Sequence, residues 1–342
     1  MQLPSLNFGE LVARLPIIQG GMGVGVSLSG LASAVANEGG VGVIATAMIG
    51  MKDPHRSTDP IGADNRILSD EIHKAHENMI DGLLGVNIMC ALTNFKELVV
   101  TSLKEKVDVI FSGAGLPLDL PKYLGEVSEE LKEKLRTKLV PIVSSGRAAS
   151  ILCRKWLSKF DYLPDGFVVE GPRAGGHLGF KPDQIDDPNF SLETIVDDVI
   201  KAVKPYAEKA KRHIPVIAAG GVYSGKDIAR FLKMGASGVQ MGTRFVATHE
   251  CDADIAFKNA YLAARKEDMT IIKSPVGLPG RALTNSFLDD VAKGKRTPRK
   301  CIFKCLHSCD EKKAPYCIAQ ALVNAYKGKL NHGFVFAGAN AY

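Results

Sequence analysis

The chain has 342 residues, 46% of them hydrophobic and 23% charged, and its formal net charge at neutral pH is +6. These are the values of an ordinary globular protein, so a largely disordered chain is excluded. The mildly basic balance suits an anionic small-molecule ligand. Because the basic residues are not interleaved with aromatic ones, a nucleic-acid partner is disfavoured.

Neither secretion nor membrane insertion is expected from the sequence. The first fifteen residues include Glu10 and contain no long apolar run, so we expect no signal peptide. The most apolar stretch, residues 28–51, is interrupted by Asn37, Glu38 and glycines and does not resemble a membrane span. The seven cysteines are an odd number and are unevenly placed, which favours a reducing, cytoplasmic location over a disulfide framework.

Eight short apolar runs recur along the chain, and most end in a small or polar residue. They are continuously apolar, without alternation, which is typical of parallel strands buried on both faces. In chain order they span residues 16–20, 40–46, 83–89, 107–113, 139–145, 165–171, 214–220 and 238–243.

Helical periodicity follows most of these runs. The expected helices span residues 29–37, 94–105, 148–159, 191–210 and 226–234. Strands that alternate with helices predict parallel βα units. Eight such units indicate an α/β fold of the (β/α)₈ TIM-barrel class, with a doubly wound open sheet as the alternative, because spacing alone does not show closure.

Two segments fall outside this repeat. Residues 51–80 are polar, and we interpret them as an insertion after the second strand that could act as a lid. Residues 251–342 continue beyond the eighth strand and are predicted to be a helical C-terminal extension, with helices at 253–266 and 318–326. We therefore divide the chain into a barrel, residues 1–250, and this extension.

Glycine recurs at the predicted carboxyl ends of the strands, where barrel enzymes place their active sites. One glycine after a strand is ordinary turn chemistry, but glycine at six of seven ends on one face indicates a flat or phosphorylated ligand lying against the backbone. The strand-end residues are Gly20–Gly23, Asn87 and Met89, Gly113–Gly115, Ser144–Gly146, Glu170–His177, Ala219–Gly221 and Gln240–Thr243.

The ends of the seventh and eighth strands carry the most specific pattern, AAGG at 218–221 and MGTRF at 241–245. Barrels frequently bind phosphate at this place through backbone N–H groups and a helix N-terminus. Thr243 adds a hydroxyl donor. Two tight turns without a ligand would give the same pattern, but a phosphate site is the favoured interpretation.

The segment EGPRAGGHLGF at 170–180 follows the sixth strand, and Pro172 and four glycines exclude a helix there. It presents one imidazole, that of His177. A lone histidine is more often a surface or packing residue, but this position on the catalytic face favours a catalytic role as proton acceptor or donor. No nucleophile elbow and no zinc-type histidine spacing accompany it, so hydrolase chemistry and a catalytic zinc are disfavoured.

A cysteine-rich segment, residues 301–317, lies near the C-terminus. Four soft ligands this close together could hold zinc or an iron–sulfur cluster, but the spacing C-x₃-C-x₃-C-x₇-C matches neither class of motif. Simple packing is favoured, and metal binding or redox-active thiols stay open as alternatives. The thiols are Cys301, Cys305, Cys309 and Cys317. The basic residues around them, at 293–313, are either a solvated arm or a docking patch for an acidic partner.

Six strings in the chain, taken together and in order, resemble the nitronate monooxygenase family, formerly called 2-nitropropane dioxygenases. The same superfamily includes the flavin-dependent enoyl-ACP reductase II enzymes. The strings are PIIQGGM near the N-terminus, GVNIM at 85–89, GAG at 113–115, EGPRAGGHLG at 170–179, IPVIAAGG at 214–221 and VQMGTRF at 239–245. The resemblance covers about residues 10–290.

This resemblance implies FMN bound on a TIM barrel, with His177 as the active-site histidine. Residues implied to lie along the isoalloxazine and the rest of the flavin are Gly21, Met22, Gly23, Asn87, Glu170, Gly175 and Gly176. Residues implied to hold the ribityl phosphate are Gly220, Gly221, Gln240, Met241, Gly242 and Thr243. We add Gly113 and Ser145 as cofactor contacts because of their strand-end positions. Pro172 and Arg173 depart from the family pattern before the AGGH string.

Two reactions are compatible with this resemblance. In the favoured one, His177 deprotonates a nitroalkane or binds a nitronate, and O₂ is the co-substrate. In the other, NAD(P)H reduces the flavin for an enoyl thioester, and the basic segment docks acyl carrier protein. A barrel that binds a flavin or a phosphorylated metabolite without turnover is the third interpretation, and a homodimer is left open.

Overall fold

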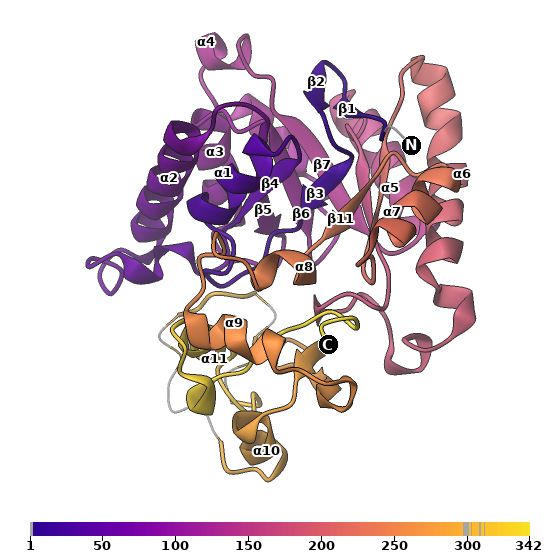
Figure 1. Ribbon diagram of the computed structural model, residues 1–342. Coiled ribbons are helices and arrows are strands. Elements are labelled where there is room, and N and C mark those ends of the chain that lie inside the picture. Colours follow the sequence, from indigo (N-terminus) through magenta and orange to yellow (C-terminus); the bar gives the residue numbers. More distant parts are fainter. Residues whose placement is uncertain (1–2, 297–300, 302, 308, 311) are drawn as a thin grey trace.

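The computed structural model describes residues 3–296, 301, 303–307, 309–310 and 312–342, and its centre is a closed barrel of eight parallel strands (Figure 1). The strands, in chain order, are β3 (Ile17–Gln19), β4 (Val41–Ala45), β5 (Leu83–Met89), β6 (Val109–Gly113), β7 (Lys138–Val143), β8 (Phe167–Glu170), β10 (Val216–Ala219) and β11 (Gly238–Met241). All eight predicted strands are confirmed, and each bound lies within two residues of the prediction. Since β11 pairs with β3, the sheet closes and the open-sheet alternative is wrong.

Helices surround this barrel (Figure 1). The longer ones are α1 (Ser29–Asn37), α2 (Pro60–Asn78), α3 (Phe95–Lys104), α5 (Gly146–Phe160), α6 (Leu192–Ala210) and α7 (Gly225–Lys233). Two short helices, α4 (Glu129–Lys132) and α8 (Thr243–Val246), lie in connecting segments. The five helices predicted from periodicity are therefore confirmed. In the part of the chain that the structure describes, no helix is both long and apolar enough to cross a membrane.

Helix α2 corrects the expectation that residues 51–80 are an insertion with a lid. It packs against α1 and α3, so residues 60–78 form the regular helix between strands β4 and β5. Asp59 caps its first turn by accepting a hydrogen bond from the N–H of Gly62, and Pro60 stands at its first position, where proline suits a helix. The helix buries few large apolar side chains, among them Leu68 and Ile72, which is why its sequence appears polar.

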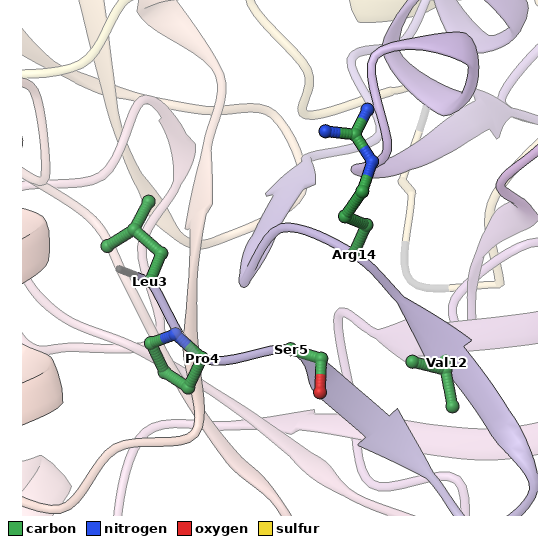
Figure 2. A pocket seen from close by; sticks show the side chains of 5 residues that line it. All are labelled: Leu3, Pro4, Ser5, Val12 and Arg14. Atoms are coloured by element: carbon green, nitrogen blue, oxygen red, sulfur yellow. The ribbon is translucent and has the colours of Figure 1, made fainter. Parts of the chain in front are cut away.

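A hairpin of β1 (Leu6–Phe8) and β2 (Leu11–Ala13) plugs the end of the barrel where the strands begin. The apolar side chains on its inner face are buried among interior residues such as Phe111 and Val168, so this hairpin belongs to the barrel core. Figure 2 shows a hollow on its outer side, lined by Leu3, Pro4, Ser5, Val12 and Arg14. This hollow lies at the end opposite to the carboxyl ends of the strands.

The C-terminal segment is mixed in structure, so the expectation of a helical extension is wrong. Its elements are α9 (Ile255–Leu262), β12 (Met269–Lys273), β13 (Pro279–Leu283), α10 (Ser286–Ala292) and α11 (Ile318–Tyr326). Helix α11 matches its predicted bounds, and α9 is shorter than predicted. The segment lies below the barrel in Figure 1, on the side where α8 follows β11. A short strand from the barrel, β9 (Gly176–His177), joins the β12–β13 hairpin through antiparallel pairing with β13.

Candidate active site

The glycine-rich loop after β3 packs directly on neighbouring strand ends. A Cβ atom at Gly21 would lie 2.3 Å from the Cβ atom of Asn87 in β5. A Cβ atom at Gly242 would lie 3.3 Å from the Sδ atom of Met22. Four of the predicted contacts, two in the loop after β3, one in β5 and one after β11, are therefore brought together, and glycine leaves the space that the neighbouring side chains occupy.

The loops after β10 and β11 present unused backbone donors. Gly220 and Gly221 have φ values of +91° and +94°, which favour glycine. The N–H groups of Gly221, Gly242 and Thr243 have no acceptor among the residues that the structure describes. Unsatisfied N–H groups on adjacent loops are typical of anion-binding sites.

Gln240 supplies a second unsatisfied polar group near these loops. Its Oε1 atom is buried and lacks a hydrogen-bond partner in the described part of the chain. Its side chain packs against Gly20, where a Cβ atom would lie 3.2 Å away from it. A buried, unpaired amide oxygen is costly, so a ligand that donates a hydrogen bond here would stabilise the site.

His177 is held in the short strand β9. Its Nε2 atom lies 2.7 Å from the Oγ atom of Ser274, and its ring packs edge-on against Phe336 with 5.0 Å between the ring centroids. Burial lowers the pKa of His177 to about 4. The imidazole is therefore neutral at physiological pH and can accept a proton.

Ser274 fixes the orientation of this imidazole. It is only 3% exposed and stands at the end of the β12–β13 hairpin, 97 positions from His177 in the chain. Its Oγ atom also accepts a hydrogen bond from the N–H of Val276 at 3.4 Å. This second bond holds the hydroxyl in place, so Ser274 is a positioning residue for His177.

Glu170 is the second titratable group at the strand ends. It ends strand β8, where it lies opposite Ala219 of β10, and it is half-buried. Its carboxyl group has no hydrogen-bond partner among the described residues, and burial raises its pKa to about 7. A proton on this group is therefore gained or lost near neutral pH.

Three predicted cofactor contacts have evident structural roles. The Oγ atom of Ser145 accepts a hydrogen bond from the N–H of Ala148 and caps helix α5. Gly113 packs on Ile142, which would lie 3.0 Å from a Cβ atom there. The carbonyl of Met241 accepts a hydrogen bond from Gly20 at 2.9 Å. These positions are explained without a ligand, and their contact with a cofactor stays a prediction.

The loop before His177 is covered by the end of the chain. A Cβ atom at Gly175 would lie 2.6 Å from the backbone of Ala337 and Gly338, and Gly176 has a φ of +81°. Sequence patterns gave no indication of this contact or of Ser274 and Phe336, because these residues lie in a segment without an identifiable motif. Arg173 was noted from the sequence only as a departure from the family pattern, and no role was predicted for it.

The cysteine-rich segment packs onto the loop after β3. Cys305 and Cys317 join an apolar cluster with Val24 and Met48, and burial raises the pKa of the Cys305 thiol to about 12. Cys301 and Cys309 are close enough to act electrostatically on Cys305. Among the described residues, no group of three or more histidine, cysteine or acidic side chains is arranged to hold a metal ion.

The basic residues around these cysteines are in part exposed. Arg299 and Lys300 lie outside the described residues. The lysines that the structure describes as exposed are Lys293, Lys295, Lys304, Lys312 and Lys313.

Comparison with known proteins identifies the family behind this arrangement. The family model described as nitronate monooxygenase matches residues 8–342. The chain belongs to the nitronate monooxygenase family. Members of this family are flavin-dependent oxidoreductases, and the chain has the closed parallel barrel of the TIM-barrel class. The resemblance stated from the sequence motifs is thereby confirmed.

Individual relatives carry different names. The chain is 30% identical over 283 residues to the (3aS,4S,5R,7aS)-5-hydroxy-7a-methyl-1-oxo-octahydro-1H-indene-4-carboxyl-CoA dehydrogenase of Rhodococcus jostii, with 82% of this chain and 66% of that protein covered. It is 24% identical to a probable nitronate monooxygenase of Staphylococcus saprophyticus, covering 84% of this chain and 81% of the relative. The structure of FabK from Thermotoga maritima is similar with a TM-score of 0.69 and 28% identity, covering 95% of this chain and 86% of FabK.

Proposed function

We propose that the protein is an FMN-dependent nitronate monooxygenase that oxidises alkyl nitronates with O₂. The observation that carries this proposal is His177, a neutral imidazole fixed by Ser274 on the face where the glycine loops converge. A neutral, oriented base beside a bound electron acceptor suits the removal of a proton next to a nitro group.

FMN fits the unsatisfied groups of this face. The free N–H groups of Gly221, Gly242 and Thr243 suit its phosphate, and the buried Oε1 atom of Gln240 suits a donor on the cofactor. We assign the flat ring to the loop of Gly21, which packs closely on neighbouring strands. When bound, the flavin supplies the electron acceptor of the reaction.

The protein's own part in the reaction is proton transfer and anion binding. A ring nitrogen of His177 takes the proton from the α-carbon of a nitroalkane, and the electrons of that C–H bond form the C=N bond of the nitronate. The imidazolium that results lies beside the nitronate anion and stabilises it. With a preformed nitronate, the neutral imidazole donates a hydrogen bond to the nitronate oxygen.

A thioester substrate is the second candidate. It is favoured by the name of one similar protein, the carboxyl-CoA dehydrogenase from R. jostii, because a carboxyl-CoA is a thioester. That protein is more similar in sequence to this chain than the probable nitronate monooxygenase is. In this reaction NAD(P)H is the reductant of an enoyl thioester, and His177 holds or protonates the thioester oxygen as negative charge develops there.

Anaerobic mixing of the flavin-loaded protein with propyl-2-nitronate, NADH and NADPH, each alone, separates these functions. We expect rapid loss of the oxidised-flavin absorbance with the nitronate. Loss with NADH or NADPH but none with the nitronate would replace the first function by the second. A yellow protein that responds to none of the three would be a binding protein without turnover.

The rate with a preformed nitronate should fall as the pH rises through about 7. Burial raises the pKa of Glu170 to about 7, so above this pH a carboxylate forms at the strand ends and repels the anionic substrate. His177, with a pKa lowered by burial to about 4, stays neutral over the same range. The measurement is kcat/KM between about pH 5.5 and 9.

The variant Glu170→Gln should flatten this profile, since an amide does not ionise. Glu250→Gln, an exposed glutamate on the C-terminal side of α8, serves as the matched control and should keep the wild-type profile. An unchanged inflection in Glu170→Gln would show that another group titrates.

A further inference from the structure

The last residues of the chain cross the two loops assigned to the phosphate. The N–H of Gly338 donates to the Oγ1 atom of Thr243 at 3.3 Å. The side-chain amide of Asn340 donates to the carbonyl of Gly221 at 2.9 Å, although the two residues are 119 positions apart. The C-terminal segment, residues 338–340, is thus bonded to both loops.

Arg173 lies between this segment and the glycine loop. A Cβ atom at Gly221 would lie 2.9 Å from the Cβ atom of Arg173, so the stem of the arginine runs across the face of that glycine. The N–H of Ala339 donates to the carbonyl of Arg173 at 3.0 Å. The guanidinium of Arg173 donates to the Oδ1 atom of Asn340, also at 3.0 Å. The side chain of Asn340 therefore links the guanidinium of Arg173 to the loop of Gly221, because it binds both.

A second guanidinium, that of Arg281, lies near Arg173. Arg281 faces Gly176 across the β13–β9 pair and donates to the carbonyl of Pro172 at 2.9 Å. Burial lowers the pKa of Arg281. The negative charge of Asp186 acts in the opposite direction and raises this pKa, whereas the positive charge of Arg173 lowers it further.

Neither of these two arginines has an ion-pair partner among the described residues. Arg173 is exposed, Asp186 acts on Arg281 only from beyond ion-pair distance, and the Nε atom of Arg281 is buried without a hydrogen-bond partner. Two cations held close together repel each other unless an anion lies between or beside them. Because Arg173 lies across Gly221, whose backbone N–H is free, this place is suited to an anionic ligand.

We propose that the C-terminal segment completes the phosphate site of the cofactor, with Arg173 binding the phosphate and Asn340 positioning Arg173 and the Gly221 loop. The inference rests on the proposed function, because it takes the phosphate to be that of FMN. Arginine suits this role because its planar guanidinium donates paired, charge-assisted hydrogen bonds to phosphate oxygens.

Comparison of FMN with riboflavin tests the proposal, because riboflavin lacks the phosphate. The dissociation constants of both are measured by fluorescence titration of the full-length protein freed of flavin. We expect Arg173→Ala to weaken FMN binding by about tenfold or more and to change riboflavin binding by less than about twofold. Asn340→Ala should weaken FMN binding by about three- to tenfold.

The double variant tests whether Asn340 acts through Arg173. If it does, Arg173→Ala combined with Asn340→Ala should bind FMN only slightly more weakly than Arg173→Ala alone. Arg154→Ala, an exposed arginine on α5, and Asn331→Ala, an exposed asparagine of the C-terminal segment, are the matched controls and should bind FMN as the wild type does.

Equal losses for FMN and riboflavin, or no loss of FMN binding in Arg173→Ala, would overturn the inference while leaving the proposed function in place. A wild-type protein that binds neither flavin would instead overturn the proposed function, and this inference with it. Fully additive effects in the double variant would remove Asn340 as the positioning residue of Arg173.

Discussion

Replacing His177 by alanine should leave FMN bound and lower turnover with a nitroalkane by at least about 100-fold, in the range for the loss of a general base. The residue is half-buried, its imidazole is neutral, and its Nε2 atom is fixed 2.7 Å from the hydroxyl of Ser274. Alanine removes the proton acceptor but none of the backbone donors that we assign to the phosphate. The measurement is kcat by oxygen uptake, together with the flavin content of the purified variant.

The chain offers a matched control for this variant. His213 also has its Nε2 atom beside a serine hydroxyl, that of Ser237 at 3.0 Å, but it is exposed and lies before strand β10, at the opposite end of the barrel. His213→Ala should leave turnover unchanged. Ser274→Ala should lower kcat by about tenfold, less than His177→Ala, because the base remains but is less well oriented. Undiminished turnover in His177→Ala would remove His177 from the mechanism.

The barrel was predictable from the sequence because its strands are buried on both faces. A strand such as β5 or β10 is then continuously apolar and stands out from its surroundings. Helix α2 was missed for the opposite reason. It has one narrow buried stripe and a long exposed face, so its polar composition resembles that of a loop.

The site was predictable where its residues stand at the carboxyl ends of the barrel strands. The strand-end glycines and His177 lie in short strings after predicted strands, so their position follows from the order of the βα units. Ser274 and Asn340 act through contacts across 97 and 119 positions, and no local pattern encodes such contacts. Strand β12, which leads to Ser274, has no fully buried residue, and β13 contains Pro279 and Arg281, so neither strand shows the continuous apolar run of the barrel strands.

Replacing Gly21 by alanine should lower the affinity for FMN by about 100-fold because the new methyl group has no space. This loss is equivalent to about 3 kcal/mol, at the upper end of the cost of overpacking. The new Cβ atom would lie 2.3 Å from the Cβ atom of Asn87 and 2.8 Å from its Cγ atom. At Asn87, strand β5 pairs on both sides, with Ala45 of β4 and Phe111 of β6. The strand therefore cannot move away from the new Cβ atom.

The loop after β3 must move instead, and it is the loop that we assign to the flavin ring. Gly125→Ala is the matched control, because a Cβ atom there would have no neighbour within 4 Å, and it should bind FMN normally. The double variant Gly21→Ala with Asn87→Gly removes the clashing atoms of Asn87 and should recover part of the affinity for FMN. The recovery should be incomplete because the double variant also lacks the side-chain amide of Asn87. If Gly21→Ala binds FMN as tightly as the wild type while keeping its fold by circular dichroism, the flavin ring does not lie on this loop.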